Sequence, residues 1–318
     1  MTSSAGSSSV ASNSKLGLGL ALAAAGAVGF SGKAIIVKLG YRYGVDPVTL
    51  IMYRMLFALP VFVLMAWWAG RGKAPLDARQ WRGVFFLGFT GYYFSSFLDF
   101  LGLQYITASL ERLILYLNPT LVLLISLALY RHRIGRHQVV GLLISYAGLA
   151  VVFGQELGSQ GPEVVLGSAL VFGSALSYAV YLVYSGELVK RLGSLRLVGL
   201  ASTVACVCCI LQFLILKPLS AAEVPVEVIG LSVLNALACT VAPVLLMMMA
   251  VERIGPALSS QVGMFGPMVT LILGAWILGE AITGWVLLGT GLVLAGVYAV
   301  TRQPQSPLPG RGTSAQDH

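Results

Sequence analysis

Long hydrophobic runs separated by short polar connectors make up almost the whole chain. A helix rises about 1.5 Å per residue, so about twenty apolar residues can cross the ~30 Å hydrocarbon core of a bilayer. Ten runs have this length or nearly so, at residues 16–38, 48–69, 83–103, 108–129, 138–154, 164–186, 197–216, 228–250, 257–279 and 284–301. The pattern predicts an all-α membrane protein with ten transmembrane helices.

Polar segments remain at the two ends of the chain and between the runs. We expect residues 1–15, which are rich in Ser, and residues 302–318 to be disordered tails. Residues 155–163 are expected to form a linker loop. The run at 16–38 is too long for a cleaved signal peptide, so we interpret it as the first helix.

Composition agrees with a chain whose solvent is lipid, because 57% of the residues are hydrophobic and only 10% are charged. Soluble chains carry about 25% charged residues. The formal net charge of +8 does not predict a nucleic-acid partner, since the cations lie between the hydrophobic runs and form no basic face. All four cysteines lie inside apolar runs, which favours buried packing over disulfides or a metal site.

The distribution of Lys and Arg predicts the orientation in the membrane. If the N-terminus is cytoplasmic, fourteen of the 20 cations fall on the cytoplasmic side, and only Lys38, Arg42 and Lys217 fall on the other side. Cytoplasmic loops carry the excess of Lys and Arg in membrane proteins. We therefore expect a multi-pass protein of the bacterial inner membrane with both termini in the cytoplasm.

The chain contains an internal repeat with a register of 148 residues. The matched residues include Gly19 with Gly167, Pro119 with Pro267, Gly141 with Gly289 and Gly148 with Gly296. The halves, residues 16–154 and 164–301, hold five predicted helices each. Five is odd, so the second half must cross the membrane inverted relative to the first. Inverted repeats are typical of secondary transporters that work by alternating access, although a duplicated scaffold without transport is an alternative.

Two stretches of the repeat resemble a known family. They read GLQYITASLERLILYLNPTLVLLISLALYRHRIGRHQVVGLLISYAGLAVVF and AVERIGPALSSQVGMFGPMVTLILGAWILGEAITGWVLLGTGLVLAGVYAV. Each has a small-residue helix start, a Pro in mid-helix and a Gly-rich last helix, which resembles EamA-type carriers of the drug/metabolite transporter superfamily. Arg54 resembles an Arg often found in that family's second helix. The resemblance covers about residues 16–301 and implies a carrier of small metabolites.

One position departs from the family pattern. A Glu follows the Pro-bearing helix in the second half, at Glu280, but the matching residue in the first half is His132. We expect Glu280 to make a loop or helix-end contact and to take no part in the transport chemistry.

Five ionisable residues fall within predicted spans: Lys33, Arg54, Asp99, Glu111 and Arg112. Each costs ~2.5–3.5 kcal/mol at a helix centre, so such residues are functional candidates. All five belong to the first half, and a site built from the repeat is therefore expected to be polar mainly on one wall. Structural alternatives stay open, including snorkelling of Lys33 and an ion pair of Arg54 with either carboxylate.

Stripes of polar residues at helical spacing also cannot all face lipid, because their hydroxyls and amides would lack partners. We predict that they line a cavity shared by both halves, although hydrogen bonds between helices are an alternative. The predicted substrate-binding residues are Lys33, Arg54, Tyr92, Ser96, Asp99, Glu111, Arg112, Asn118, Tyr178, Tyr181, Asn235 and Gln261.

These patterns predict a secondary transporter for a small metabolite, with an amino acid or a related zwitterion as the candidate substrate. Asp99 and Glu111 are the candidates for proton coupling, because burial shifts carboxyl groups toward the working pH range. A channel or sensor is an alternative. A membrane-embedded enzyme is less favoured, since all three His lie in a loop or a tail and no HExxH or Walker motif is present. No cofactor or metal is expected, and the pattern leaves the oligomeric state open.

Overall fold

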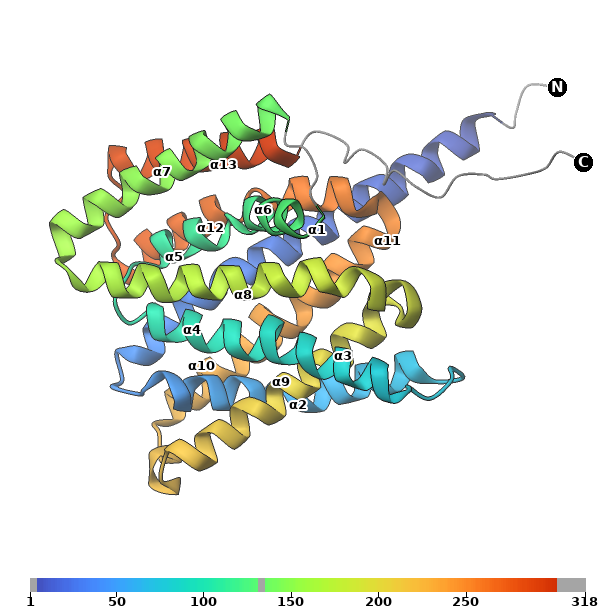
Figure 1. Ribbon diagram of the computed structural model, residues 1–318, viewed down its shortest axis with the longest axis horizontal. Coiled ribbons are helices and arrows are strands. Elements are labelled where there is room, and N and C mark those ends of the chain that lie inside the picture. The colour runs from blue at the N-terminus through green and yellow to red at the C-terminus, as the bar shows by residue number, and fades with distance from the viewer. Residues whose placement is uncertain (1–4, 131–134, 302–318) are drawn as a thin grey trace, which may run out of the picture.

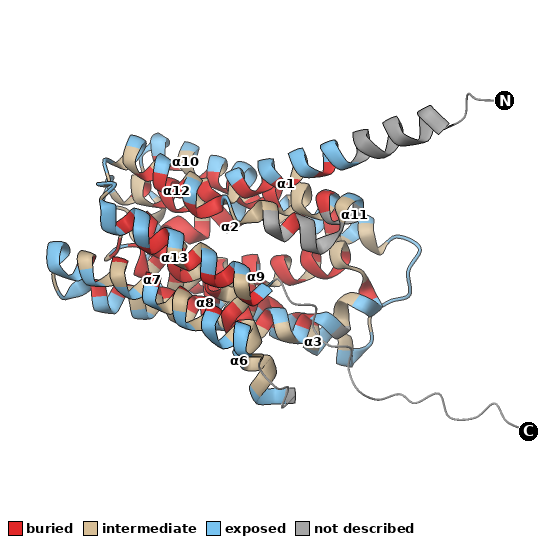
Figure 2. Cartoon of the chain, turned by 90° about the horizontal axis from the view of Figure 1, so that it is seen from above, coloured by how far each residue is buried: buried red, intermediate tan, exposed pale blue. Residues whose placement is uncertain are grey.

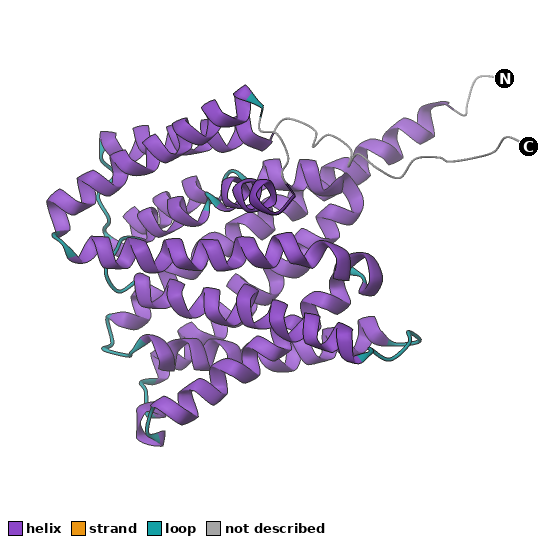
Figure 3. Cartoon of the chain, in the orientation of Figure 1, coloured by secondary structure: helices purple, strands orange, loops and turns teal. Residues whose placement is uncertain are grey.

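The computed structural model describes residues 5–130 and 135–301 of the chain, without the side chains of 5–15, 130, 187, 251–252, 255–258 and 260–261. This part consists of helices joined by short loops and contains no strand (Figure 3). The helices are α1 (Ala5–Tyr41), α2 (Pro47–Gly70), α3 (Ala78–Gly88), η1 (Phe89–Phe94), α4 (Ser95–Gly102), α5 (Ala108–Leu115), α6 (Asn118–Tyr130), α7 (Arg136–Gln160), α8 (Glu163–Leu192), α9 (Ser194–Leu216), η2 (Leu219–Ala222), α10 (Val226–Ala236), η3 (Leu237–Val241), α11 (Ala242–Gly263), α12 (Gly266–Leu273), η4 (Gly274–Leu278) and α13 (Gly284–Thr301).

The helices confirm the predicted all-α membrane fold. Within the described residues, nine helical stretches are long and apolar enough to cross a membrane. A shorter apolar helix, Gly266–Leu278, lies in the ninth predicted run and completes the set of ten. Three of the nine stretches, and the shorter helix as well, combine α-helix with a π-helical turn or a break, so one span can correspond to more than one element of Figure 1.

The predicted tail and linker differ from the structure. Helix α1 begins at Ala5, which places most of the expected N-terminal tail in helix, and residues 302–318 lie outside the described residues. The linker expected at 155–163 shrinks to Gly161 and Pro162 between α7 and α8. Each residue added to an existing helix gains a backbone hydrogen bond, so helices extend beyond their apolar runs.

The fourth and ninth hydrophobic runs are broken helices. Residues 116–117 separate α5 from α6, and residues 264–265 separate α11 from α12. Pro119 and Pro267 follow the breaks, and proline removes a backbone donor and clashes with the carbonyl four residues earlier. In addition, α11 is helical through the connector predicted between the eighth and ninth runs.

The repeat is visible in these irregular turns. Two of the three π-helical turns in the described residues begin at Phe89 in η1 and at Leu237 in η3, which are 148 residues apart, whereas η4 has no π-helical counterpart in α6. The breaks at 116–117 and 264–265 have the same separation. Because π-turns are rare and usually mark functional sites, their recurrence at one register supports two related five-helix halves.

The two halves pack through matched pairs of helices. Helix α7 lies against α13, α1 against α11, α2 against α9 and α4 against α8 (Figure 1). A Cβ atom on Gly141 would lie 2.8 Å from the Gly296 carbonyl oxygen, and one on Gly148 would lie 2.6 Å from that of Gly289. The register of 148 exchanges these two contacts, as expected for a pseudo-two-fold axis between the halves.

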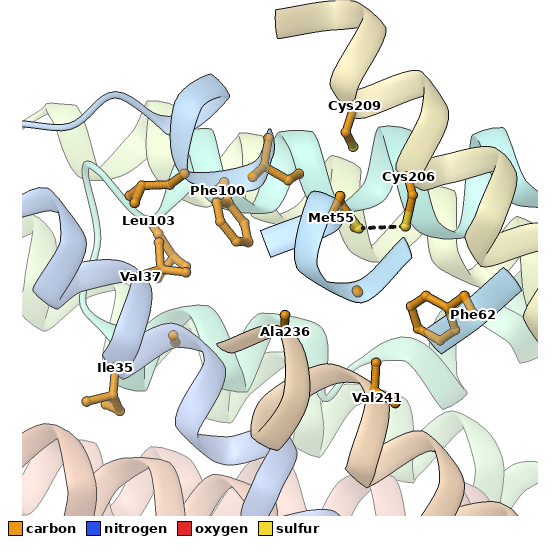
Figure 4. Close-up of a cluster of buried hydrophobic side chains, with 14 of the residues drawn as sticks. Ile35, Val37, Met55, Phe62, Phe100, Leu103, Cys206, Cys209, Ala236 and Val241 are labelled. Carbon is orange, nitrogen blue, oxygen red and sulfur yellow. Dashed lines mark hydrogen bonds between the residues drawn. The ribbon is translucent and has the colours of Figure 1, made fainter. Parts of the chain in front are cut away.

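Buried residues lie mainly on the helix faces that meet other helices, and exposed residues cover the outer surface of the bundle (Figure 2). The largest apolar cluster joins α1, α2 and α4 to α9, α10 and η3, and includes Met55, Phe100 and Cys206 (Figure 4). The Cys206 thiol donates a hydrogen bond of 3.7 Å to the Met55 sulfur. All four cysteines are free thiols.

Candidate substrate-binding site

A cavity of about 310 Å³ lies between the two halves, lined by charged, polar and aromatic side chains. Its walls come from both halves: α1, α2, η1, α4, α5 and α6 on one side and α8, α9, η3, α11 and α12 on the other. The lining residues are Ala27, Phe30, Lys33, Arg54, Met55, Phe62, Gly91, Tyr92, Ser95, Ser96, Asp99, Arg112, Leu115, Tyr116, Asn118, Ser174, Tyr178, Ser202, Ala205, Cys239, Thr240, Val244, Met247, Gly263 and Gly266.

The cavity lies on the axis that relates the halves. Many lining residues form pairs separated by 148 positions, such as Phe30 with Tyr178, Arg54 with Ser202, Asp99 with Met247 and Asn118 with Gly266. In these pairs the charged member always belongs to the first half. The scaffold of the cavity is therefore symmetric, and its ionisable chemistry is confined to one wall.

Both broken helices contribute to this cavity at their breaks. Leu115 and Gly263, which precede the breaks, and Asn118 and Gly266, which follow them, all line it. Proline four residues later deprives the Leu115 and Gly263 carbonyls of their helical donors. Irregular backbone at membrane depth is tolerated where it lines a cavity, and binding sites of secondary transporters use it.

A half-buried lysine, Lys33, pairs with both acidic groups. The Lys33 ammonium lies 2.5 Å from Asp99 Oδ2 and 3.2 Å from Glu111 Oε1. The side chain of Lys33 is 15% exposed, whereas those of Asp99 and Glu111 are 2% and 0% exposed. One cation thus pairs with two carboxylates and offsets one of their two negative charges, in a medium of low dielectric constant where each charge interacts strongly with its neighbours.

Two arginines complete the charged wall. Arg54 Nε donates a hydrogen bond of 2.9 Å to Thr240 Oγ1, and the guanidinium lies 5.3 Å from the centre of the Phe100 ring. Arg112 Nη2 donates to Ser31 Oγ at 3.3 Å. Arg54 and Arg112 reach the cavity from α2 and α5, so the positive charge comes from separate helices of the first half.

Tyrosines cover another part of the wall. The Tyr92 and Tyr181 hydroxyls are 3.2 Å apart, and the Tyr92 ring meets that of Tyr178 edge-on at 6.4 Å between centroids. Tyr92 lies seven residues before Asp99 along η1 and α4, a rise of about 10 Å. The cavity therefore has a charged end and an aromatic, hydroxyl-rich end.

Comparison with known proteins identifies the family. Residues 17–154 and 165–302 each match the EamA-like transporter family. The chain belongs to this family. The two matches start 148 residues apart, which is the register found in the sequence.

Relatives of this EamA-like transporter include the uncharacterized transporter YcbK of Bacillus subtilis (strain 168), which is 30% identical over 84% of this chain and 87% of its own length. YyaM, another uncharacterized transporter of that organism, is 26% identical over 68% of this chain and 71% of its own. A solved crystal structure of a protein superposes with a TM-score of 0.61 at 20% identity, over 88% of this chain and 95% of that one.

The comparisons confirm the resemblance found in the sequence. This EamA-like transporter is a multi-pass membrane protein in a lipid bilayer, and its relatives carry the names of transporters and not of enzymes. Within the described residues, no three His, Cys, Asp or Glu side chains gather in a way that could hold a metal ion.

The structure brings most of the predicted site residues together. Lys33, Arg54, Tyr92, Ser96, Asp99, Arg112, Asn118 and Tyr178 line the cavity. Glu111 lies behind Lys33, and Tyr181 lies behind Tyr92. Asn235 lies apart from the cavity, in a small void beside Phe100, and the side chain of Gln261 lies outside the described residues.

Some wall residues of the EamA-like transporter escaped the sequence pattern. Phe30 and Phe62 line the cavity. They were not predicted because an apolar side chain in a spanning helix gives the same sequence signal whether it faces lipid or protein. The wall also receives residues from α2 and α9, beyond Arg54, which the polar stripes did not indicate. The repeat register held a usable signal here, because Ser202 and Met247 are the partners of Arg54 and Asp99.

A second cavity, of about 330 Å³, lies near the loop between α1 and α2 and is lined by Lys38, Arg42 and Glu280, among others. Glu280 Oε1 accepts a hydrogen bond of 2.7 Å from the Ala108 amide, and Oε2 accepts one of 2.8 Å from Ser109 Oγ. Glu280 thus caps the first turn of α5, which is the helix-end contact expected for it. His132, its counterpart in the repeat, lies outside the described residues.

Proposed function

We propose that this EamA-like transporter is a secondary carrier that moves a small metabolite, an amino acid or a related zwitterion, by alternating access. The observation that carries the proposal is the position of the mixed-charge cavity on the axis between two inverted halves, at the breaks of two helices. An inverted repeat allows the same packing to occur in two mirrored states, one open to each side of the membrane.

The size and chemistry of the cavity support a small substrate. Ligand cavities have volumes of about 300–1,000 Å³ and combine apolar walls with a few convergent polar groups. This cavity, at about 310 Å³, falls at the lower end of that range. Its cations and carboxylates lie close together, so both charges of a zwitterion find a complementary group.

The charged layer formed by Lys33, Asp99 and Glu111 is placed to act as a gate. Lys33 and Asp99 line the central cavity, whereas Lys38 lines the second cavity and follows Lys33 by five residues on α1, about 7.5 Å along the helix. Phe100, which is fully buried, lies beside the charged layer. We infer that breaking the Lys33 ion pairs opens the central cavity toward the second one.

Protons are the proposed coupling ion. Asp99 and Glu111 share Lys33, so adding a proton to one carboxylate leaves a single ion pair and weakens the layer. Proton binding would then favour the state in which the gate opens, because a ligand shifts a conformational equilibrium toward the state that binds it better.

Reconstituted protein tests the carrier and its coupling. A thermal-shift screen against a metabolite library first identifies a substrate, since a ligand that binds the folded state raises its stability. In liposomes with a pH gradient, we expect Asp99→Asn or Glu111→Gln to abolish accumulation of that substrate. Glu227→Gln, an exposed carboxylate at the start of α10, is the matched control and should transport normally. Full gradient-driven accumulation in both cavity variants would overturn proton coupling through them.

We also propose that the protein lies in the bacterial inner membrane with both termini in the cytoplasm. The excess of Lys and Arg in alternate connectors supports this orientation. The first turn of α1 and the last turn of α13 lie toward the same end of the bundle, on the right of Figure 1. A C-terminal reporter that is active only in the cytoplasm should therefore be active, and an inactive reporter would contradict the orientation.

A further inference from the structure

The charges around the central cavity do not balance. Three cations, Lys33, Arg54 and Arg112, meet two carboxylates, Asp99 and Glu111, so the ionised groups leave an excess of one positive charge. Both carboxylates lie within 3.2 Å of Lys33. The lysine engages both acidic groups, and this cluster keeps one negative charge, so the excess positive charge comes from the two arginines.

Arg54 is the more buried of these two arginines and is only 7% exposed. Among the described residues, no carboxylate lies within ion-pair distance of its guanidinium. Thr240 fixes Nε and the Phe100 ring packs on the guanidinium plane, but Nη1 is buried without a hydrogen-bond partner. A buried charged donor left without a partner is costly, so this nitrogen indicates a group that the cavity receives from outside.

Arg112 presents a second guanidinium to the same space. It lines the cavity, and its contact with Ser31 Oγ, at 3.3 Å, is long for a charge-assisted hydrogen bond. The partners of the two arginines lie side by side: Arg112 donates to Ser31 on α1 and Arg54 donates to Thr240 on η3, and a Cβ atom on Gly32 would lie 3.0 Å from the Cys239 sulfur. The two arginines therefore reach neighbouring parts of the wall.

We infer that Arg54 and Arg112 form a subsite for the carboxylate of the transported molecule, an inference that rests on the proposed carrier function. A guanidinium presents a planar set of donors that matches a carboxylate, and two of them hold it from different helices. One carboxylate supplies the single negative charge that the cavity lacks. The carboxylate is thus the group that the site recognises first.

The opposite end of the cavity defines the rest of the substrate. Tyr92 and Tyr178 lie there with Ser95 and Ser174, whose hydroxyls are 3.0 Å apart. Asp99 is the sole carboxylate among the described residues that line the cavity, and Lys33 already pairs with it. Lys33 engages Oδ2, whereas Asp99 Oδ1 is buried without a hydrogen-bond partner and remains able to accept from an ammonium group on the substrate. The favoured substrates are small carboxylates, zwitterions included, with an aromatic or hydroxylated body about 10 Å or less in length.

Binding of three matched probes to the purified protein tests the subsite. Phenylalanine, 3-phenylpropanoate and phenethylamine share a ring and differ in carrying both charges, only the carboxylate or only the amine. We expect both carboxylates to bind and the amine to bind at least about tenfold more weakly in titration calorimetry, because only the carboxylates engage the arginines. Amine binding equal to that of 3-phenylpropanoate, or failure of both carboxylates to bind, would overturn the subsite.

Variants assign the effect to the two arginines. Arg54→Gln and Arg112→Gln should each weaken 3-phenylpropanoate binding about tenfold or more, while Arg54→Lys keeps part of it. Lys217→Gln removes the same charge from the loop pair with Asp46 and should bind normally. If Arg54→Gln does not fold, Arg112→Gln and the probe series on the unaltered protein still test whether the arginines bind the carboxylate. Unchanged affinity in Arg112→Gln contradicts the assignment.

The carrier and the subsite fail in different ways. Arginine-dependent binding of the carboxylates without flux in liposomes would leave the subsite standing and overturn the carrier. Saturable transport of a substrate whose affinity is unchanged in both arginine variants would support the carrier and overturn the subsite.

Discussion

Asp46 shows how one side chain outside the membrane holds two segments together. It is the N-cap of α2, where Oδ1 accepts a hydrogen bond of 3.0 Å from the Val48 amide and Oδ2 accepts one of 2.7 Å from Thr49 Oγ1. The Lys217 ammonium lies 3.2 Å from Oδ1. Burial raises the pKa of Asp46, but the hydrogen bonds from Thr49 and the pairing with Lys217 outweigh it, and the net pKa is lowered.

This lowered pKa predicts a pH-dependent contribution to stability. The folded-state pKa lies below the unfolded value of about 3.9, so the carboxylate stabilises the fold above that value and the contribution is lost as the pH falls through the folded-state pKa. We expect Asp46→Ala to lower the free energy of unfolding by about 1 kcal/mol near neutral pH, with a smaller effect in acid. Denaturant unfolding in detergent from about pH 7 to about pH 3 measures it. Asp46→Asn keeps an N-cap acceptor and should lower the free energy of unfolding by less. An effect of Asp46→Ala that does not change with pH would contradict this account.

The sequence indicated which residues belong to the site, but not which of them pair with one another. Burying a charge in lipid is so costly that Lys33, Asp99 and Glu111 stood out from the sequence alone. That Lys33 bridges both carboxylates, while Arg54 lacks one, depends on how α1, α2, α4 and α5 are turned toward each other. Helical spacing orders residues on one helix but does not orient one helix against another.

At the scale of elements, close helix packing rests on glycines that face a neighbouring backbone. A Cβ on Gly148 of α7 would lie 2.6 Å from the Gly289 carbonyl oxygen of α13. Gly154, also on α7, has open space at the same position. The two glycines therefore offer a matched comparison within one helix.

We expect Gly148→Ala to destabilise the protein by about 1–3 kcal/mol, because the added methyl forces α7 and α13 apart. Gly154→Ala should be neutral or stabilise by up to about 1 kcal/mol through helix propensity. Melting temperatures of the two variants in the same detergent make the comparison. Equal melting temperatures would show that the crossing is not as tight as the structure has it.

The positions of most helices followed from hydrophobic length, and the repeat register followed from matched Pro and Gly residues. The breaks in the two helices could not be predicted from the sequence, because Pro119 and Pro267 only permit a kink and tertiary packing decides whether one forms. The helical extension of α7 to Gln160 was also missed, since polar residues beyond the apolar run give no membrane signal. Hydropathy locates the segments that lie in the membrane, but it does not show where their helices end outside it.

At the scale of the whole molecule, a symmetric scaffold carries asymmetric chemistry. The five ionisable groups of the central site come from the first half, and residues such as Ser202 and Met247 occupy the matching places in the second. This division fits a carrier in which the inverted halves supply the two states and one wall supplies recognition.

Counterflow in proteoliposomes tests alternating access most directly. Vesicles are loaded with unlabelled substrate at high concentration, and labelled substrate is added outside at trace concentration. A carrier exchanges the two through one site, so we predict a transient accumulation of label above its equilibrium level, followed by decay. Label that rises monotonically to equilibrium, with no overshoot and no saturation, is the behaviour of a channel and would contradict the account.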